Sequence, residues 1–212
     1  DMLADRLPSP KEATLNKVQR YYTGPLQGAV FEAMQACDAD GPLVIQITKL
    51  YQTLDALDFR VFGRVMSGTA RLGDRVKILG EGYSQDDEED LVQATIEQVF
   101  ISETRYYVPA EAVPAGSLVL LGGVDASITK TATICSASLT SDELYIFRPL
   151  AHMTQSVLKI AVEPLVPSEL PKMLDGLRKI NKSYPLAVTK VEESGEHIIL
   201  GTGELYLDCV MH

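Results

Sequence analysis

The sequence contains only three histidines, and the only Glu–His neighbours form the pair Glu196 and His197. Carboxylate and imidazole groups can exchange protons near neutral pH, so the pair invites a general acid–base reading. Neighbouring residues of a strand point to opposite faces of its sheet, however, and could not act together on one substrate atom. We therefore expect Glu196 and His197 to form a structural or interface hairpin, and we predict no catalytic residue in the chain.

The sequence also offers little support for a metal site or a catalytic nucleophile. The three cysteines, Cys37, Cys135 and Cys209, stand too far apart for a zinc knuckle or a redox pair, and no serine has the setting of a hydrolase nucleophile. The run Asp38–Gly41 resembles the start of a calcium loop, but Lys49 occupies the position at which that loop needs glutamate. No metal site is expected, and the run is interpreted as a turn.

A nucleotide site would need a glycine-rich loop ending in Lys-Ser or Lys-Thr, which the sequence lacks. The nearest approach is Gly201-Thr202-Gly203 before an expected helix, since a helix N-terminus can hold an anion. Glu204 follows and would repel phosphate, so we interpret this segment as a tight strand-to-helix turn. The chain itself is expected to bind no cofactor.

Arg60 and Arg64 are two further candidate interface residues, in a different segment of the sequence from Glu196 and His197. Both alternate with apolar residues in the segment 59–65, which predicts a half-buried strand with the arginines on its outer face. With Arg71 and Arg75 they could form a basic stripe that touches an RNA backbone, or they could be ordinary solvated arginines. The acidic run 86–90 is interpreted as a solvated loop between strands.

Composition narrows the class of protein that could carry these residues. The chain has 212 residues, is 46% apolar and 23% charged, and has a net charge of −10. These values predict a globular protein, and the negative charge argues against binding bare nucleic acid by charge alone, so any RNA contact must be local. No apolar run is long enough for a membrane span, and the dispersed cysteines fit the reducing cytosol or nucleus.

The elements that must position these residues fall into two expected domains. Residues 1–40 are broken by proline and glycine, and are predicted to be an entry linker in which only residues 26–37 form a helix. Residues 41–138 alternate like short strands between turns, with strands expected at 94–101, 106–108, 118–121 and 131–135. Six or seven such strands without intervening helices predict a small closed β-barrel.

The pattern changes after a second linker at residues 139–152. The apolar run 157–162 predicts a strand, and apolar residues at helical spacing predict a helix with Ser168 as its cap and Pro185 beyond its end. A hairpin and a second helix near Glu204 follow. This order predicts an α+β domain at 153–212, a ferredoxin-like split βαβ unit that is C-terminally truncated before its last strand.

Two groups of strings resemble known families. The first group resembles the β-barrel second domain of the translational GTPases, and comprises Phe62–Val65, Ser67–Thr69 and Gly73–Val76. The second resembles the third domain of elongation factor two, and comprises Val157–Pro164, Leu170–Leu177, Glu192–Ile199 and Gly201–Leu205. Within that family the strings Asp86–Asp90, Asn181–Pro185 and Tyr206–His212 resemble the spliceosomal branch, the GTPase of the U5 small nuclear ribonucleoprotein.

This resemblance implies a nuclear role in pre-mRNA splicing for a non-catalytic middle section that follows an absent GTPase domain. GTP and magnesium would belong to that absent domain. The implied partners are the chain's own GTPase domain and later domains, a large spliceosomal scaffold protein, and small nuclear RNA through a local contact, with no membrane. A ribosomal translocation factor and a stand-alone RNA-binding barrel are the alternative interpretations.

Overall fold

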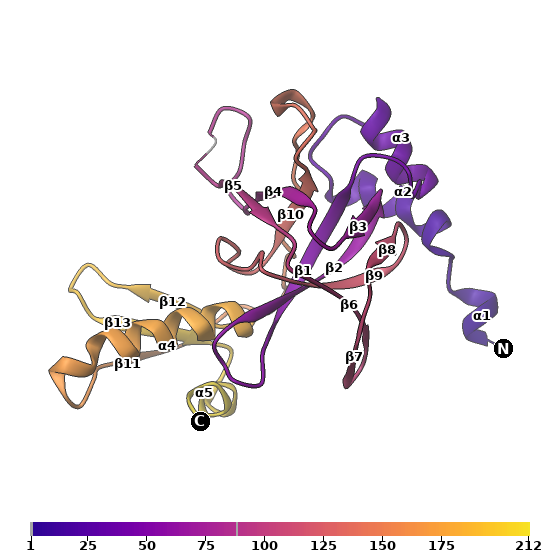
Figure 1. Ribbon diagram of the computed structural model, residues 1–212. Helices are drawn as coiled ribbons and strands as arrows, with labels where there is room; N and C mark the ends of the chain where they lie inside the picture. Colours follow the sequence, from indigo (N-terminus) through magenta and orange to yellow (C-terminus); the bar gives the residue numbers. More distant parts are fainter. Residues whose placement is uncertain (1, 88) are drawn as a thin grey trace. The chain divides into compact units, whose positions relative to one another are not determined.

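The computed structural model describes residues 2–87 and 89–212, and divides into two compact units, Asp1–Pro149 and Leu150–His212 (Figure 1). The first holds most of the β-structure, and the second combines a three-stranded sheet with two helices. The chain is therefore rich in β-sheet with a few helices, as the alternating sequence pattern predicts. The domain boundaries at 41, 138 and 153 stay predictions.

An eight-stranded antiparallel sheet forms the body of the first unit, in the order β5-β4-β10-β1-β2-β9-β6-β7. The long central pair is β1 with β2, and a separate two-stranded sheet joins β3 to β8. The strands are β1 (Val44–Gln52), β2 (Phe59–Ser67), β3 (Thr69–Arg71), β4 (Arg75–Leu79), β5 (Leu91–Thr95), β6 (Gln98–Glu103), β7 (Tyr106–Pro109), β8 (Ala112–Pro114), β9 (Leu118–Gly122) and β10 (Ala132–Ser136).

The closed barrel predicted from sequence is not formed by the residues that the structure describes. Closure would need β5 to pair with β7, the two ends of the strand order, and no ladder joins them. All four residues of β7 are exposed, and the hairpin of β6 and β7 points away from β5 in Figure 1. Because this hairpin projects into solvent, the eight strands form an open sheet.

The predicted strand at 94–101 is interrupted at Ile96. Its side chain is fully buried, its N–H donates to the main-chain oxygen of Asp74 at 3.0 Å, and its carbonyl accepts from Gly73 N–H at 2.8 Å. These two bonds hold Ile96 against the turn before β4, so β5 ends at Thr95 and β6 begins at Gln98. The other strand predictions in this unit, at 106–108, 118–121 and 131–135, are confirmed within a residue at each end.

Both faces of this sheet are buried at its centre, because successive residues of β1 enter different hydrophobic clusters. Ile45 and Ile47 pack inward with Val65 and Ile134, whereas Val44 packs on the opposite face with Met34. The second cluster also receives Leu144 and Phe147 from the segment after β10, around the short 3₁₀ turn η1 (Ser141–Glu143). The first forty residues therefore supply one cover of the sheet.

The prediction that residues 1–40 hold only one helix, at 26–37, is wrong. Three helices form there, namely α1 (Met2–Arg6), α2 (Pro10–Tyr21) and α3 (Ala29–Ala36). Ser9 caps α2 in a reciprocal pair, in which Ser9 Oγ accepts from Glu12 N–H at 3.3 Å and Glu12 Oε2 accepts from Ser9 N–H at 2.9 Å. Pro10 occupies the first helical turn, where its missing N–H removes no bond.

The second unit contains β11 (Leu158–Val162), the 3₁₀ turn η2 (Pro167–Glu169), α4 (Leu170–Ser183), β12 (Val188–Val191), β13 (His197–Gly201) and α5 (Glu204–Met211). Its sheet has the order β11-β13-β12, and β13 is antiparallel to both neighbours. Strands β11 and β12 are thus parallel, joined through α4, and separated by β13. That is the arrangement of a split βαβ unit.

The helix α4 packs one apolar stripe on this sheet, as its sequence period predicts. Leu177 is buried with Ile199 and Leu207, and Met173 and Ile180 flank the cluster. The predicted cap Ser168 is wrong, because Ser168 lies inside η2 and α4 begins at Leu170 without a side-chain cap. The turn of η2 takes the place of a cap, since its main chain already leads into the helix.

Candidate functional site

Arg60 lies on the outer face of β2, where the sequence predicts it, and two aromatic rings cover it. Its guanidinium carbon is 4.6 Å from the ring centroid of Phe100 and 5.0 Å from that of Tyr107. The face of an aromatic ring attracts a cation at these distances. The β6–β7 hairpin, which supplies both rings, therefore fixes the position of the charge.

A cleft of about 850 Å³ opens beside this arginine. Its wall comes from the β1–β2 loop, the start of β6, the β6–β7 turn and the segment after β9. Four carboxylates line it, those of Asp55, Asp58, Glu97 and Asp125, with only two guanidinium groups, those of Arg60 and Arg105. The cleft therefore has more negative than positive side chains. The basic stripe expected from the arginines would have the opposite sign.

Arg64 lies on the same face of β2 as Arg60. Its guanidinium is hydrogen-bonded within the chain. Its Nη2 donates to the main-chain oxygen of Pro10 at 2.8 Å and to Thr14 Oγ1 at 3.0 Å. Arg64 thus holds the first turn of α2 against β2. The structure does not bring the side chains of Arg60 and Arg64 into one group, and a docking role for Arg64 stays a prediction.

Arg71 and Arg75, the other members of the expected basic stripe, line a different cavity of about 550 Å³ with Asp40, Asp74 and Ser138. Asp40 N–H donates to Asp38 Oδ1 at 3.0 Å, so the run that resembles a calcium loop closes as a small turn. Arg71 N–H donates to Asp74 Oδ2 at 3.0 Å, which shapes the turn before β4. The four arginines therefore serve three separate places rather than one continuous stripe.

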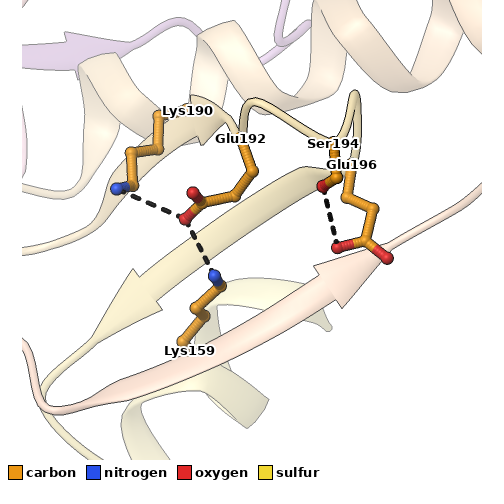
Figure 2. A network of polar contacts seen from close by, with 5 residues as sticks. All are labelled: Lys159, Lys190, Glu192, Ser194 and Glu196. Carbon is orange, nitrogen blue, oxygen red and sulfur yellow. Dashed lines mark hydrogen bonds and ion pairs between the residues drawn. The ribbon is translucent and has the colours of Figure 1, made fainter.

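Glu196 and His197 lie at the hairpin that joins β12 to β13. Glu196 accepts a hydrogen bond from Ser194 Oγ at 3.3 Å (Figure 2), and its main-chain oxygen accepts from Glu192 N–H at 2.9 Å. His197 is half-buried, and begins β13 between Val162 of β11 and Val191 of β12. The contacts of Glu196 and His197 thus belong to the hairpin itself. An interface role for the pair stays a prediction.

The same hairpin carries a small ionic network, drawn in Figure 2. Glu192 Oε1 accepts from Lys159 Nζ at 2.8 Å and lies 3.3 Å from Lys190 Nζ. Hydrogen bonds from Lys159 and then Lys190 hold the pKa of the Glu192 carboxyl below its ordinary value. Because Lys159 belongs to β11 and Lys190 to β12, the network links the two outer strands across β13.

Groups for covalent or metal chemistry are scattered through the described residues. No cluster of three or more His, Cys, Asp or Glu side chains there could hold a metal ion. Cys135 is buried in the second hydrophobic cluster, and burial raises the pKa of its thiol to about 12. Cys209 is exposed. No helix in the described part of the chain has the length and apolar character needed to cross a membrane.

The loop between β1 and β2 was missed by the sequence reasoning. Thr53 Oγ1 donates to Asp55 Oδ1 and to the main-chain oxygen of Asp58, and the N–H groups of Leu57 and Asp58 donate to side chains of the same loop. Aspartate and threonine side chains often bond main-chain groups of nearby residues in turns, as Asp55 does with Leu57 N–H, so these residue types are the signal the sequence offered. In the acidic run 86–90, Asp87 N–H donates to the main-chain oxygen of Ser84 at 3.1 Å, and Glu88 lies outside the described residues.

Comparison with known proteins matches 97–100% of the chain to two U5 small nuclear ribonucleoprotein components and a pre-mRNA-splicing factor. It is 56% identical over 211 residues to the 110 kDa U5 small nuclear ribonucleoprotein component CLO and to the 109 kDa component GFL, both of Arabidopsis thaliana. It is 54% identical over 208 residues to the pre-mRNA-splicing factor cwf10 of Schizosaccharomyces pombe. No protein-family model matches the chain.

The alignments cover 97–100% of this chain but only 21–22% of each relative. The chain thus spans about a fifth of the length of the curated relatives that it matches. Identity of this degree along the entire chain shows homology to a segment of these U5 components and this splicing factor. The resemblance to the spliceosomal branch, drawn from short strings, is confirmed by these relatives.

Proposed function

We propose that this chain is a middle section of a pre-mRNA splicing GTPase of the U5 small nuclear ribonucleoprotein. The observation that carries the proposal is its 54–56% identity, over 97–100% of its length, to two U5 components and a splicing factor. Similarity at that level along the whole length of the segment supports a shared role. In this proposal the protein works in the nucleus.

Within that protein the chain acts as a mechanical connector. The β-rich first unit supports the resemblance to the second domain of translational GTPases, and the order β11-β13-β12 supports a ferredoxin-like third domain. A change of nucleotide state elsewhere in the protein would move these units as bodies and pass the change to later domains. GTP and magnesium would bind outside this segment.

The proposed partners follow from the same resemblance. The first unit would contact the protein's own GTPase domain and a large scaffold protein of the particle, and any small nuclear RNA contact would be local. The net charge of −10 supports protein contacts over an extended RNA contact, because an RNA backbone demands positive surface. Coupling to control of the spliceosomal helicase is part of this proposal.

The test is to recover the tagged full-length protein from cells and to identify the RNA that comes with it. We expect U5 small nuclear RNA to be enriched and ribosomal RNA to remain at the background of an untagged control. Enrichment of ribosomal RNA without small nuclear RNA would overturn the proposal and favour a ribosomal translocation factor of the same family.

A second test addresses the non-catalytic role of the segment. The 212-residue chain, titrated with GTP and magnesium in a calorimeter, should give no binding heat, since the sequence contains no phosphate-cradling loop. The full-length protein is the positive control. Binding of GTP by the short chain at micromolar affinity would contradict a purely mechanical role.

A further inference from the structure

The loop between β1 and β2 displays two leucines to solvent, and one of them, Leu54, lines the 850 Å³ cleft. Leu54 is fully exposed, and Leu57 is 69% exposed. Single exposed leucines are common on protein surfaces. Two leucines on one short loop beside a large cleft offer a partner apolar surface next to a polar wall.

Hydrogen bonds within the loop fix its main chain. Thr53 N–H donates to the main-chain oxygen of Asp58 at 3.0 Å, and Ala56 N–H donates to that of Thr53 at 3.0 Å. Ala56 has a φ of 58°, in the left-handed region that alanine rarely adopts. A conformation of this kind persists only when its surroundings impose it. The leucines are therefore held out in advance, which lowers the entropy lost on binding.

The charges beside the leucines indicate what kind of partner fits. Asp55 and Asp58 belong to the same loop, and Glu97 and Asp125 also line the cleft. Hydrogen bonds from Thr53 Oγ1 and Leu57 N–H lower the pKa of Asp55, so it is charged at neutral pH. Arg60, one of two cations in the cleft, is already covered by Phe100 and Tyr107.

This charge balance disfavours an RNA backbone, because phosphates would meet more carboxylates than free cations. It favours lysine or arginine side chains, which such carboxylates attract, and the leucines favour apolar ones. We propose that the Leu54–Leu57 loop and its cleft bind a segment of a partner protein that carries both basic and apolar residues. The proposal rests on this surface and does not depend on which particle contains the protein.

A photo-crosslinking amino acid, p-benzoylphenylalanine, tests the surface in the full-length protein inside cells. Position 54 is suitable, because its side chain is fully exposed. The matched control carries the same amino acid at Leu72, which is 55% exposed on another loop of the same unit. After irradiation the tagged protein is recovered, and the cross-linked peptide or nucleotide is identified by mass spectrometry.

We expect position 54 to cross-link to a protein peptide that contains basic and apolar residues, and position 72 not to give that peptide. In a protein that also carries Glu97→Lys and Asp58→Lys, the cross-link should be lost, whereas Glu111→Lys with Glu32→Lys, at two exposed carboxylates outside the cleft, should leave it. A cross-link to RNA, to an acidic peptide or to nothing would overturn the proposal. The RNA in the same sample shows independently whether the proposed splicing function holds.

Discussion

The guanidinium of Arg64 donates to the main-chain oxygen of Pro10 at 2.8 Å, across 54 residues of sequence. The acceptor belongs to the first turn of α2, and the same nitrogen reaches Thr14 Oγ1 one turn later. Thr14 Oγ1 in turn donates to Pro10 O at 2.6 Å. One side chain of the central sheet thus holds the helix that covers it, which makes Arg64 part of the fold.

Replacing Arg64 with alanine should therefore destabilise the first unit. The change removes two hydrogen bonds from a charged donor, so we expect the free energy of unfolding to fall by about 1–3 kcal/mol. Urea denaturation followed by circular dichroism measures it. Arg71→Ala is the control, since its side chain is exposed, and it should change stability little. Equal losses in the two variants would contradict the structural role of Arg64.

Gly63 should tolerate no side chain at all. A Cβ built there would overlap the main-chain oxygen of Gln46 on β1, next to the register shift between Ile47 and Lys49. We expect Gly63→Ala to cost about 1–3 kcal/mol or more, because a strand rather than a flexible side chain must move.

Gly176 is the matched control for that substitution. It lies inside α4, and a Cβ there would meet open space. Gly176→Ala should raise stability by about 0.5–1 kcal/mol, since alanine loses less conformational freedom in a helix. Thermal unfolding of both variants provides the comparison. A neutral Gly63→Ala would show that the two strands do not approach as the structure has them.

The thiols of Cys135 and Cys209 should react at very different rates. Burial raises the pKa of Cys135 to about 12, whereas Cys209 is exposed. The thiolate is the reactive form, so a maleimide at about pH 7.5 should label Cys209 first and Cys135 only after unfolding. Peptide mapping by mass spectrometry gives the order. Rapid labelling of Cys135 in the native chain would mean that its cluster opens readily.

The ionic network at the β12–β13 hairpin predicts that stability decreases slightly at acidic pH. The folded pKa of Glu192 lies below its unfolded value, so its contribution is present above the unfolded pKa and is lost as pH falls through the folded pKa. Carboxyl titration by NMR should give Glu192 a pKa below its value in the unfolded chain. In Glu192→Gln the acid limb of the stability curve should be flatter, and an unchanged limb would exclude the network as its source.

Local patterns were enough to predict much of this fold. The period of the apolar residues indicated α4, and alternation indicated β2 with Arg60 and Arg64 on its outer face. The helix α2 was missed although its signal was present, because Ser9, Pro10 and Glu12 form a capping box with proline at the first position. Proline was interpreted there as a breaker when it marked a beginning.

Other features depend on contacts that no local pattern contains. An open and a closed sheet have the same alternation, so the course of the β6–β7 hairpin decides between them. Likewise the spacing of the two arginines does not reveal their partners. Arg60 is covered by Phe100 and Tyr107. Arg64 is hydrogen-bonded to Pro10 and Thr14. Those partners come from distant parts of the sequence.

The proposed splicing function is tested most directly by depletion and add-back in a nuclear extract. Removing the full-length protein should stop the splicing of a labelled pre-mRNA, and adding back the purified protein should restore it. Translation in a matched cytoplasmic extract should continue after the same depletion. If splicing proceeds without the protein and translation elongation fails instead, the proposed role in the U5 particle is contradicted.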